Sequence, residues 1–183
     1  AGVDLAKRGD LGALVTGPVN KAAVAISVPG FTGHTEYIAR MTGSRNPVMM
    51  LAGPSLRVVP VTRHVPLARV PGLLSSRLIA DCVAGAARGL RRWFGLPRPR
   101  IAVCGLNPHA GDRGLLGKED SMVVAPAVRL ARRRGIAASG PHPADLVFAA
   151  CRWGRYDAVV AMYHDQGLIP VKTVEAARTV NAT

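Results

Sequence analysis

Short apolar runs alternate with longer segments of mixed character along most of this chain. Runs of aliphatic residues are typical of buried strands, and they predict strands at 11–16, 48–52, 56–62, 101–105, 136–139 and 158–162. The segments between them predict helices at 19–26, 36–41, 73–94, 121–134 and 144–152, and stretches rich in Gly and Pro predict loops at 28–35, 107–117 and 140–143. Strands that alternate with helices indicate an α/β fold, with a largely parallel sheet flanked by helices and joined by right-handed crossovers.

The length and composition agree with that fold class. The chain has 183 residues, 49% hydrophobic but only 4% aromatic, so the core is aliphatic, which favours helices packed on a sheet over a small β barrel. We expect residues 1–183 to form a single α/β unit, with a sub-boundary near residues 22–32. We expect no membrane span, because no stretch of about 18 uncharged apolar residues occurs. The charged residues Asp4 and Lys7 argue against a signal peptide at the start.

Cysteine usage and net charge indicate the cellular compartment and the kind of binding partner. Cys82, Cys104 and Cys151 are far apart and odd in number, which indicates buried free thiols and a cytoplasmic location. The net charge of +13 admits a nucleic-acid partner. However, the arginines gather on two helical segments, 88–100 and 129–134, without the interleaved aromatic residues of a single-strand binding platform. We therefore interpret the charge as a solvated surface whose field steers an anionic substrate, and we do not expect nucleic-acid binding.

Three histidines are the strongest candidates for chemistry. His64, His109 and His164 each lie shortly after a predicted strand, within a segment marked by Gly or Pro. The carboxyl ends of parallel strands meet at one edge of a sheet, where ligands of open α/β sheets bind. Imidazole is a good ligand for divalent transition metals, so these side chains predict one metal site with a position left open for substrate. The alternative is three ordinary loop histidines, since their spacing is not that of a local zinc finger.

Several other residues have both a structural and a functional interpretation. Asp112 and Asp165, close to two of these histidines, either orient or ligate beside them or merely cap turns. The pair His34-Thr35 either begins a helix, with Thr35 as its N-cap, or holds a carboxylate or phosphate there.

Two charged residues and one further histidine complete the set. Lys172 is either solvated or binds an anionic substrate and assists proton transfer. Asp145 is either a helix N-cap or a catalytic acid, and His142 is assigned to a loop with no role. The chain contains no GxGxxG, Walker, GxSxG or HExxH motif, so no standard dinucleotide site is predicted.

Six segments together resemble one enzyme family. They lie at 14–21, 31–36, 64–67, 105–117, 140–145 and 162–168, and they include the motifs NPHAGD and YHDQGL. The chain resembles the 4-hydroxythreonine-4-phosphate dehydrogenase family of vitamin B6 synthesis nearly end to end. The resemblance implies a fold like that of isocitrate and isopropylmalate dehydrogenases, in which NAD or NADP binds without a glycine fingerprint. Because family members are longer at both ends, it also implies that this is the central metal- and substrate-binding part of a two-domain chain.

The same resemblance assigns roles to the candidate residues. It implies a homodimer with the active site at the subunit interface, where one of the three metal histidines comes from the partner. The matching ligands are His64, His109 and His164, and the divalent metal is Zn, Mg, Co or Mn. Substrate-binding positions match His34, Thr35, Lys172 and Asn181. The catalytic candidates are Lys172, or an aspartate acting through water, for which Asp165 and Asp145 are available.

The implied reaction is an NAD(P)-linked oxidation with decarboxylation. The substrate is a small phosphorylated hydroxy-amino acid, 4-phosphohydroxy-L-threonine, and the product is 3-amino-2-oxopropyl phosphate. Sister enzymes that act on a threonate- or erythronate-type sugar-acid 4-phosphate, or on an aromatic cis-dihydrodiol carboxylate, share these motifs and remain alternatives. So does an inactive metal-binding or nucleic-acid-binding protein. Two positions depart from the family pattern: Arg63 stands where Thr is common, and Asp112 stands where Glu is common. The family's downstream substrate-binding arginine lies beyond Thr183.

Overall fold

The computed structural model describes residues 1–31, 33–44 and 47–183, which divide into two compact units. The first unit comprises Ala1–Pro47 together with Thr183, and the second comprises Val48–Ala182. The division thus falls between Pro47 and Val48, later than the range 22–32 expected from the sequence.

Over its described residues, 1–31, 33–44, 47 and 183, the first unit has three short helices: α1 (Gly2–Arg8), α2 (Lys21–Ser27) and α3 (His34–Thr42). Helix α2 begins later than predicted because Asn20 is its N-cap, with the side-chain Oδ1 accepting a hydrogen bond from Ala23 N at 3.1 Å. The strand predicted at 11–16 is wrong, since these residues are irregular and Val15 is 94% exposed. Of the predicted 28–35 loop, Thr32 lies outside the described residues, and α3 begins at His34.

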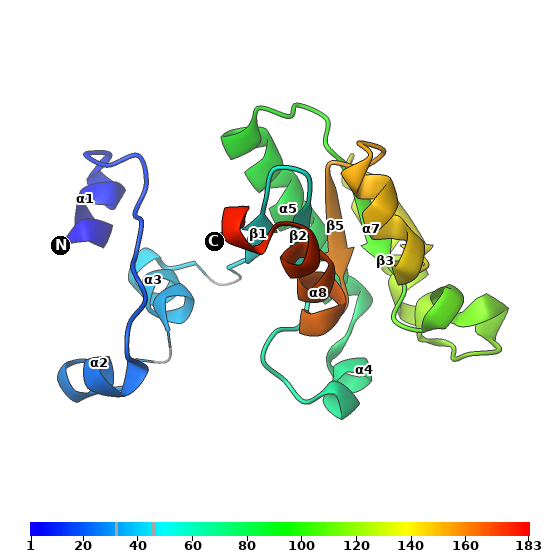
Figure 1. The fold of residues 1–183 in the computed structure, drawn as a ribbon, viewed down its shortest axis with the longest axis horizontal. Helices are drawn as coiled ribbons and strands as arrows, with labels where there is room; N and C mark the ends of the chain where they lie inside the picture. The colour runs from blue at the N-terminus through cyan, green and yellow to red at the C-terminus, as the bar shows by residue number, and fades with distance from the viewer. Residues whose placement is uncertain (32, 45–46) are drawn as a thin grey trace. The chain divides into compact units, whose positions relative to one another are not determined.

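The second unit is built on a six-stranded sheet with the order β4-β3-β5-β2-β1-β6 (Figure 1). The strands are β1 (Met50–Ala52), β2 (Arg57–Pro60), β3 (Arg100–Cys104), β4 (Ala137–His142), β5 (Ala158–Ala161) and β6 (Val180–Ala182). Strands β4, β3, β5 and β2 are parallel, whereas β1 pairs antiparallel with β2 and with β6. The predicted α/β fold with a largely parallel sheet is therefore confirmed.

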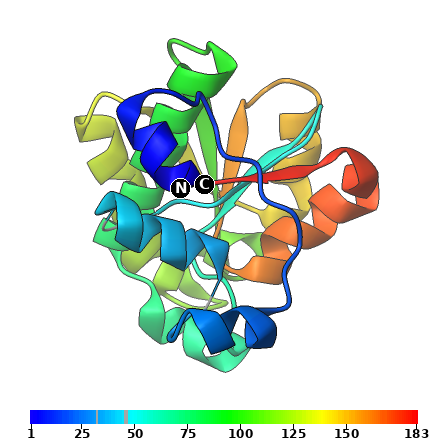
Figure 2. The ribbon, with the colours of Figure 1, turned by 90° about the vertical axis from the view of Figure 1, so that its left-hand side faces the viewer.

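Helices cover both faces of this sheet, as Figure 2 shows from the side. They are α4 (Val70–Leu73), α5 (Ser76–Phe94), α6 (Ala125–Arg133), α7 (Ala144–Arg152) and α8 (His164–Glu175). One core cluster packs α5 and α6 on the sheet, with Val83 and Leu90 fully buried. The other packs α7 and α8 on the opposite face, through residues such as Val147 and Val171. Cys82, Cys104 and Cys151 are buried and free, as predicted.

Several boundaries in the second unit differ from the sequence prediction. Helix α8 was not predicted, because Gly167 and Pro170 interrupt the helical pattern of the segment after His164. Strand β6, which has only three residues, was not predicted either. His142 was placed in a loop, but β4 extends to it through hydrogen bonding to β3. Helix α5 begins at Ser76 rather than Leu73, since the Ser75 hydroxyl caps it by accepting a bond from Leu78 N at 3.2 Å.

Among residues 1–31, 33–44 and 47–183, no single helix has the length and apolar composition to cross a membrane. One bent pair, Leu67–Leu73 with Ser76–Phe94 at 95°, meets the limits of length and composition together.

Asp157 links the start of β5 to the start of β3 and gives a pH-dependent contribution to stability. Its carboxylate accepts hydrogen bonds from Arg100 N at 2.7 Å and from the Arg100 guanidinium at 3.0 and 3.2 Å. Partial burial raises the pKa of Asp157, but these bonds and the nearby arginine charge outweigh it and hold the pKa below its usual value. A depressed pKa in the folded state stabilises the fold above the unfolded pKa, about 3.9, and that contribution disappears as the pH falls through the folded pKa.

We therefore expect Asp157→Asn to be less stable than the wild type at pH 7, and the difference to shrink as the pH falls below about 4. Urea unfolding at a series of pH values measures both free energies. A difference that stays constant down to pH 2 would show that the Asp157 carboxylate does not couple to Arg100 in this way.

Candidate functional site

The loops that carry the three predicted metal histidines leave neighbouring strands at one edge of the sheet. Strands β3, β5 and β2 lie side by side and parallel, so their carboxyl ends face the same way. His109 follows β3, His164 follows β5 and His64 follows β2. This is the edge at which open α/β sheets bind ligands.

Two of the three histidines come together within a single chain. The ring centroids of His64 and His164 are 5.3 Å apart, with the ring planes tilted by 47°. The pairing of β2 with β5 continues past the strands and holds these loops together, because Val61 N donates to Ala161 O at 2.8 Å and Thr62 Oγ1 donates to Met162 O at 2.9 Å. His64 is therefore held beside His164 by the extended ladder of the sheet.

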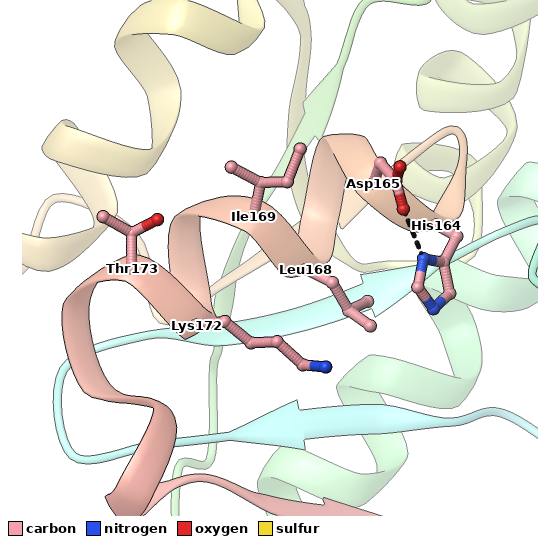
Figure 3. A pocket seen from close by; sticks show the side chains of 6 residues that line it. All are labelled: His164, Asp165, Leu168, Ile169, Lys172 and Thr173. Carbon is pink, nitrogen blue, oxygen red and sulfur yellow. Dashed lines mark hydrogen bonds and ion pairs between the residues drawn. The ribbon is translucent and has the colours of Figure 1, made fainter.

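Asp165 orients the imidazole of His164. The Nδ1–H group of His164 donates to Asp165 Oδ1 at 2.6 Å, and the side chain of His164 is 32% exposed (Figure 3). A carboxylate bonded to one ring nitrogen leaves the other nitrogen with its lone pair free, which is the arrangement found behind many metal-bound histidines. Asp165 thus contacts His164 directly, and its role beside a metal stays a prediction.

Lys172 lies on the same side of α8 as His164. The two residues are eight positions apart, close to two full turns, and both line an open depression of about 360 Å³ (Figure 3). Its other lining residues are Asp165, Leu168, Ile169 and Thr173. An anionic group that reached the histidine pair along α8 would meet an ammonium group there.

His109 occupies an unusual left-handed turn after β3. The φ angles of His109, Ala110, Asp112 and Arg113 are 52°, 53°, 40° and 54°. Such a backbone costs roughly 1–2 kcal/mol for each residue other than glycine, so surrounding contacts must hold it. Within the part of the chain that the structure describes, no three His, Cys, Asp or Glu side chains converge on a common point. One chain therefore brings together two of the three predicted ligands, while His109 is exposed on the loop after the neighbouring strand β3, and the metal site stays a prediction.

Asp120, which was not among the residues predicted from the sequence, holds the chain just before this turn. Its side chain is buried, 1% exposed, and accepts hydrogen bonds from Leu106 N at 2.6 Å, Asn107 N at 3.0 Å and Asn107 Nδ2 at 3.2 Å. Gly105 is required at the base of the turn, because a Cβ there would lie 2.7 Å from Ala110 Cα. The sequence offers one sign of this role: an acidic residue stands between a Gly-rich loop and an apolar helical segment.

The contacts described above do not bring two other candidates, Asp145 and Asn181, to the histidine pair. Asp145 is exposed in the first turn of α7, whose N-cap is Pro143, so Asp145 is not the N-cap. Asn181 is exposed on the edge strand β6, opposite Leu51 of β1. Each of them stays a prediction from the sequence.

His34 and Thr35 begin helix α3 in the first unit. The N-cap of α3 is Gly33, so Thr35 does not cap the helix. The His34 ring packs edge-on against Phe31, with centroids 5.9 Å apart. Their predicted contact with substrate remains a prediction.

The fold and site define an α/β unit with paired histidines, an orienting carboxylate and a lysine at the carboxyl edge of a parallel sheet. The family model of the pyridoxal phosphate biosynthetic protein PdxA matches residues 1–183. The chain belongs to this family.

Individual relatives agree with the family assignment. The 4-hydroxythreonine-4-phosphate dehydrogenase of Desulfosudis oleivorans is 50% identical over 182 residues, which cover 99% of this chain and 54% of that protein. The crystal structure of a Klebsiella pneumoniae protein of the same name matches with a TM-score of 0.91 and 44% identity, over 94% of this chain and 52% of that one. A terephthalate 1,2-cis-dihydrodiol dehydrogenase from Burkholderia xenovorans matches with a TM-score of 0.80 and 31% identity, over 98% and 56%. The chain thus spans about half the length of the relatives it matches.

Proposed function

We propose that the protein containing this chain is a metal-dependent, NAD(P)-linked dehydrogenase. Its proposed substrate is 4-phosphohydroxy-L-threonine, which it oxidises and decarboxylates to 3-amino-2-oxopropyl phosphate in the cytoplasm. The observation that carries the proposal is the His64–His164 pair, 5.3 Å between centroids, at the carboxyl edge of a sheet in a chain of this family.

The residues at this edge fit a divalent cation such as Zn, Co, Mn or Mg. Imidazole nitrogens suit Zn and Co, whereas Mn and Mg favour oxygen ligands, and Asp165 leaves the second nitrogen of His164 available. The third ligand of the proposed site is His109, with the set completed across the interface of a homodimer. A cation bound there would lower the pKa of the substrate hydroxyl that it contacts.

The other residues of the proposed site bind substrate and move a proton. Lys172, in the same depression as His164, either takes the proton of the C3 hydroxyl or holds an anionic group of the substrate. Asp165 and Asp145 are the alternative bases through water. His34, Thr35 and Asn181 are the proposed contacts for phosphate and carboxylate. The hydride of C3 passes to NAD(P)+ and the hydroxyl proton passes to the base. The carboxylate then leaves as carbon dioxide, and C2 takes up a proton from the base or from water.

A substrate panel tests the proposal. The protein from the complete reading frame, loaded with Zn²⁺, Co²⁺, Mn²⁺ or Mg²⁺, is assayed by NAD(P)H absorbance. The panel contains 4-phosphohydroxy-L-threonine, a sugar-acid 4-phosphate and an aromatic cis-dihydrodiol carboxylate. We expect turnover of 4-phosphohydroxy-L-threonine with metal and none after chelation. Turnover of the dihydrodiol alone would reject this assignment in favour of the activity named for the Burkholderia xenovorans neighbour.

We expect Lys172→Ala to lower kcat/KM by about 100-fold or more while metal stoichiometry stays unchanged, because proton transfer by a positioned side chain contributes 10²–10⁴-fold. Lys118→Ala is the matched control, since Lys118 is also exposed but lies outside the depression around His164. Steady-state kinetics and metal analysis on both variants measure the two effects. Unchanged kinetics for Lys172→Ala would remove Lys172 from the site.

A further inference from the structure

A row of hydrogen bonds crosses the carboxyl edge of the sheet directly beneath the histidine loops. Thr62 Oγ1 donates to Met162 O at 2.9 Å, Met162 N donates to Gln166 Oε1 at 2.6 Å, and Gln166 Nε2 donates to Gly105 O at 2.8 Å. We call these four residues the edge row. The row links the loop after β2, the loop after β5 and the loop after β3, in the order in which the strands lie in the sheet.

The edge row fixes the backbone close to each predicted metal ligand. Thr62 precedes His64 by two residues, and Met162 precedes His164 by two residues. Gly105 begins the turn that carries His109, and it is buried. A shift of any link in the row therefore moves the backbone next to a predicted metal ligand.

Gln166 is the link between the β5 and β3 loops. Its amide oxygen accepts from the first loop while its amide nitrogen donates to the second. Of the side chains of this length, only glutamine offers an acceptor and a donor at one end; glutamate has no donor when ionised, and methionine has neither a strong acceptor nor a donor. Because Gln166 stands in the first turn of α8, which begins at His164, it also fixes the start of the helix that carries Lys172.

We propose that Gln166 is a positioning residue, which fixes the His164 loop and the His109 turn of its own subunit and thereby sets the affinity of the sites they serve for a divalent cation. The inference rests on the proposed function, in which His64, His109 and His164 are the ligands. Gln166 itself does not touch the metal. Its contribution is to hold two ligand loops in register, and removal of such outer contacts typically weakens metal binding 10- to 100-fold.

Two variants separate the two halves of the amide. Gln166→Glu keeps an acceptor for Met162 N but loses the donor to Gly105 O, and Gln166→Met loses both. Co²⁺ titration of the full protein, followed by its visible absorption, gives the dissociation constant and reports ligand geometry. We expect both variants to bind Co²⁺ at least about 10-fold more weakly than the wild type, with a changed absorption band.

Glu175→Ala is the control for a purely structural role on the same helix. Glu175 lies at the other end of α8 and accepts hydrogen bonds from Ser55 and from Leu56 N, so its loss lowers the melting temperature without touching the edge row. We expect its Co²⁺ affinity to stay within about twofold of the wild type. Equal weakening in Glu175→Ala would overturn the positioning role, because it would reflect lost stability alone.

Parallel titrations distinguish failure of this inference from failure of the proposed function. If the wild type binds Co²⁺ no better than His164→Ala, the metal site itself is absent and both proposals fall. If the wild type binds more tightly than His164→Ala but both Gln166 variants match the wild type, only the positioning role of Gln166 is overturned.

Discussion

Replacing His164 with alanine is expected to lower the affinity for Zn²⁺ or Co²⁺ by more than about 100-fold, since even outer contacts to metal ligands contribute 10- to 100-fold. The expectation follows from the geometry of the His64–His164 pair. His164 faces His64 at 5.3 Å between ring centroids, and Asp165 orients its ring. His64→Ala and His109→Ala are expected to give comparable losses while the protein stays folded, because both side chains are exposed. Metal titration and circular dichroism measure affinity and fold.

His142→Ala is the matched control for the loss of a histidine. His142 lies on β4, where its Nε2 bonds with Ser139 Oγ at 2.8 Å, and it takes no part in the His64–His164 pair. Its metal affinity should equal that of the wild type. Full metal stoichiometry in His164→Ala would remove this residue from the ligand set.

Mixed dimers test how the ligands are shared between subunits. Because His64 and His164 face each other within one chain, we expect them to serve the same site, with His109 supplied by the other subunit. Dimers formed from His109→Ala and His164→Ala chains should then regain one intact site. Dimers formed from His64→Ala and His164→Ala chains should regain none. Restored activity in the second mixture would show that His64 and His164 serve different sites.

Local patterns were sufficient for most of the second unit. The strands at 48–52 and 56–62 are joined by Gly53-Pro54-Ser55, and the structure forms the β1–β2 hairpin there. By contrast, the apolar run at 11–16 forms no strand. A strand forms only where another strand pairs with it, and the sequence of one segment does not identify that partner. Helix α8 was hidden by Gly167 and Pro170, whose unfavourable propensities are outweighed by the burial of Leu168 and Val171 on the sheet.

The same distinction applies to the candidate site. His64 and His164 could be predicted because each follows a recognisable strand, and parallel strands bring their carboxyl ends together. Asp120 and Gln166 could not, because their partners are distant in sequence: Asp120 binds the backbone of Leu106, and Gln166 binds that of Gly105. Such side-chain to backbone bonds leave no periodic signal. The residues that hold the site in shape thus emerge only from the folded chain.

Asp120→Ala is expected to lower the free energy of unfolding by about 3 kcal/mol or more. The substitution leaves Leu106 N–H and Asn107 N–H without their acceptor, and each unsatisfied buried donor costs about 1–3 kcal/mol. It also frees the left-handed turn around His109, whose backbone is unfavourable without outside support. Urea unfolding followed by circular dichroism measures the loss of stability. Co²⁺ titration under conditions in which Asp120→Ala is folded should show weaker binding than in the wild type.

Asp112→Asn is the control within the same turn. Asp112 is exposed with a φ of 40°, a conformation that asparagine tolerates, so its stability should stay within about 0.5 kcal/mol of the wild type. If Asp120→Ala lost less than about 1 kcal/mol, the three hydrogen bonds to its carboxylate would not be what holds the turn. If Asp120→Ala lost much stability but kept its Co²⁺ affinity, Asp120 would stabilise the fold without determining the placement of His109.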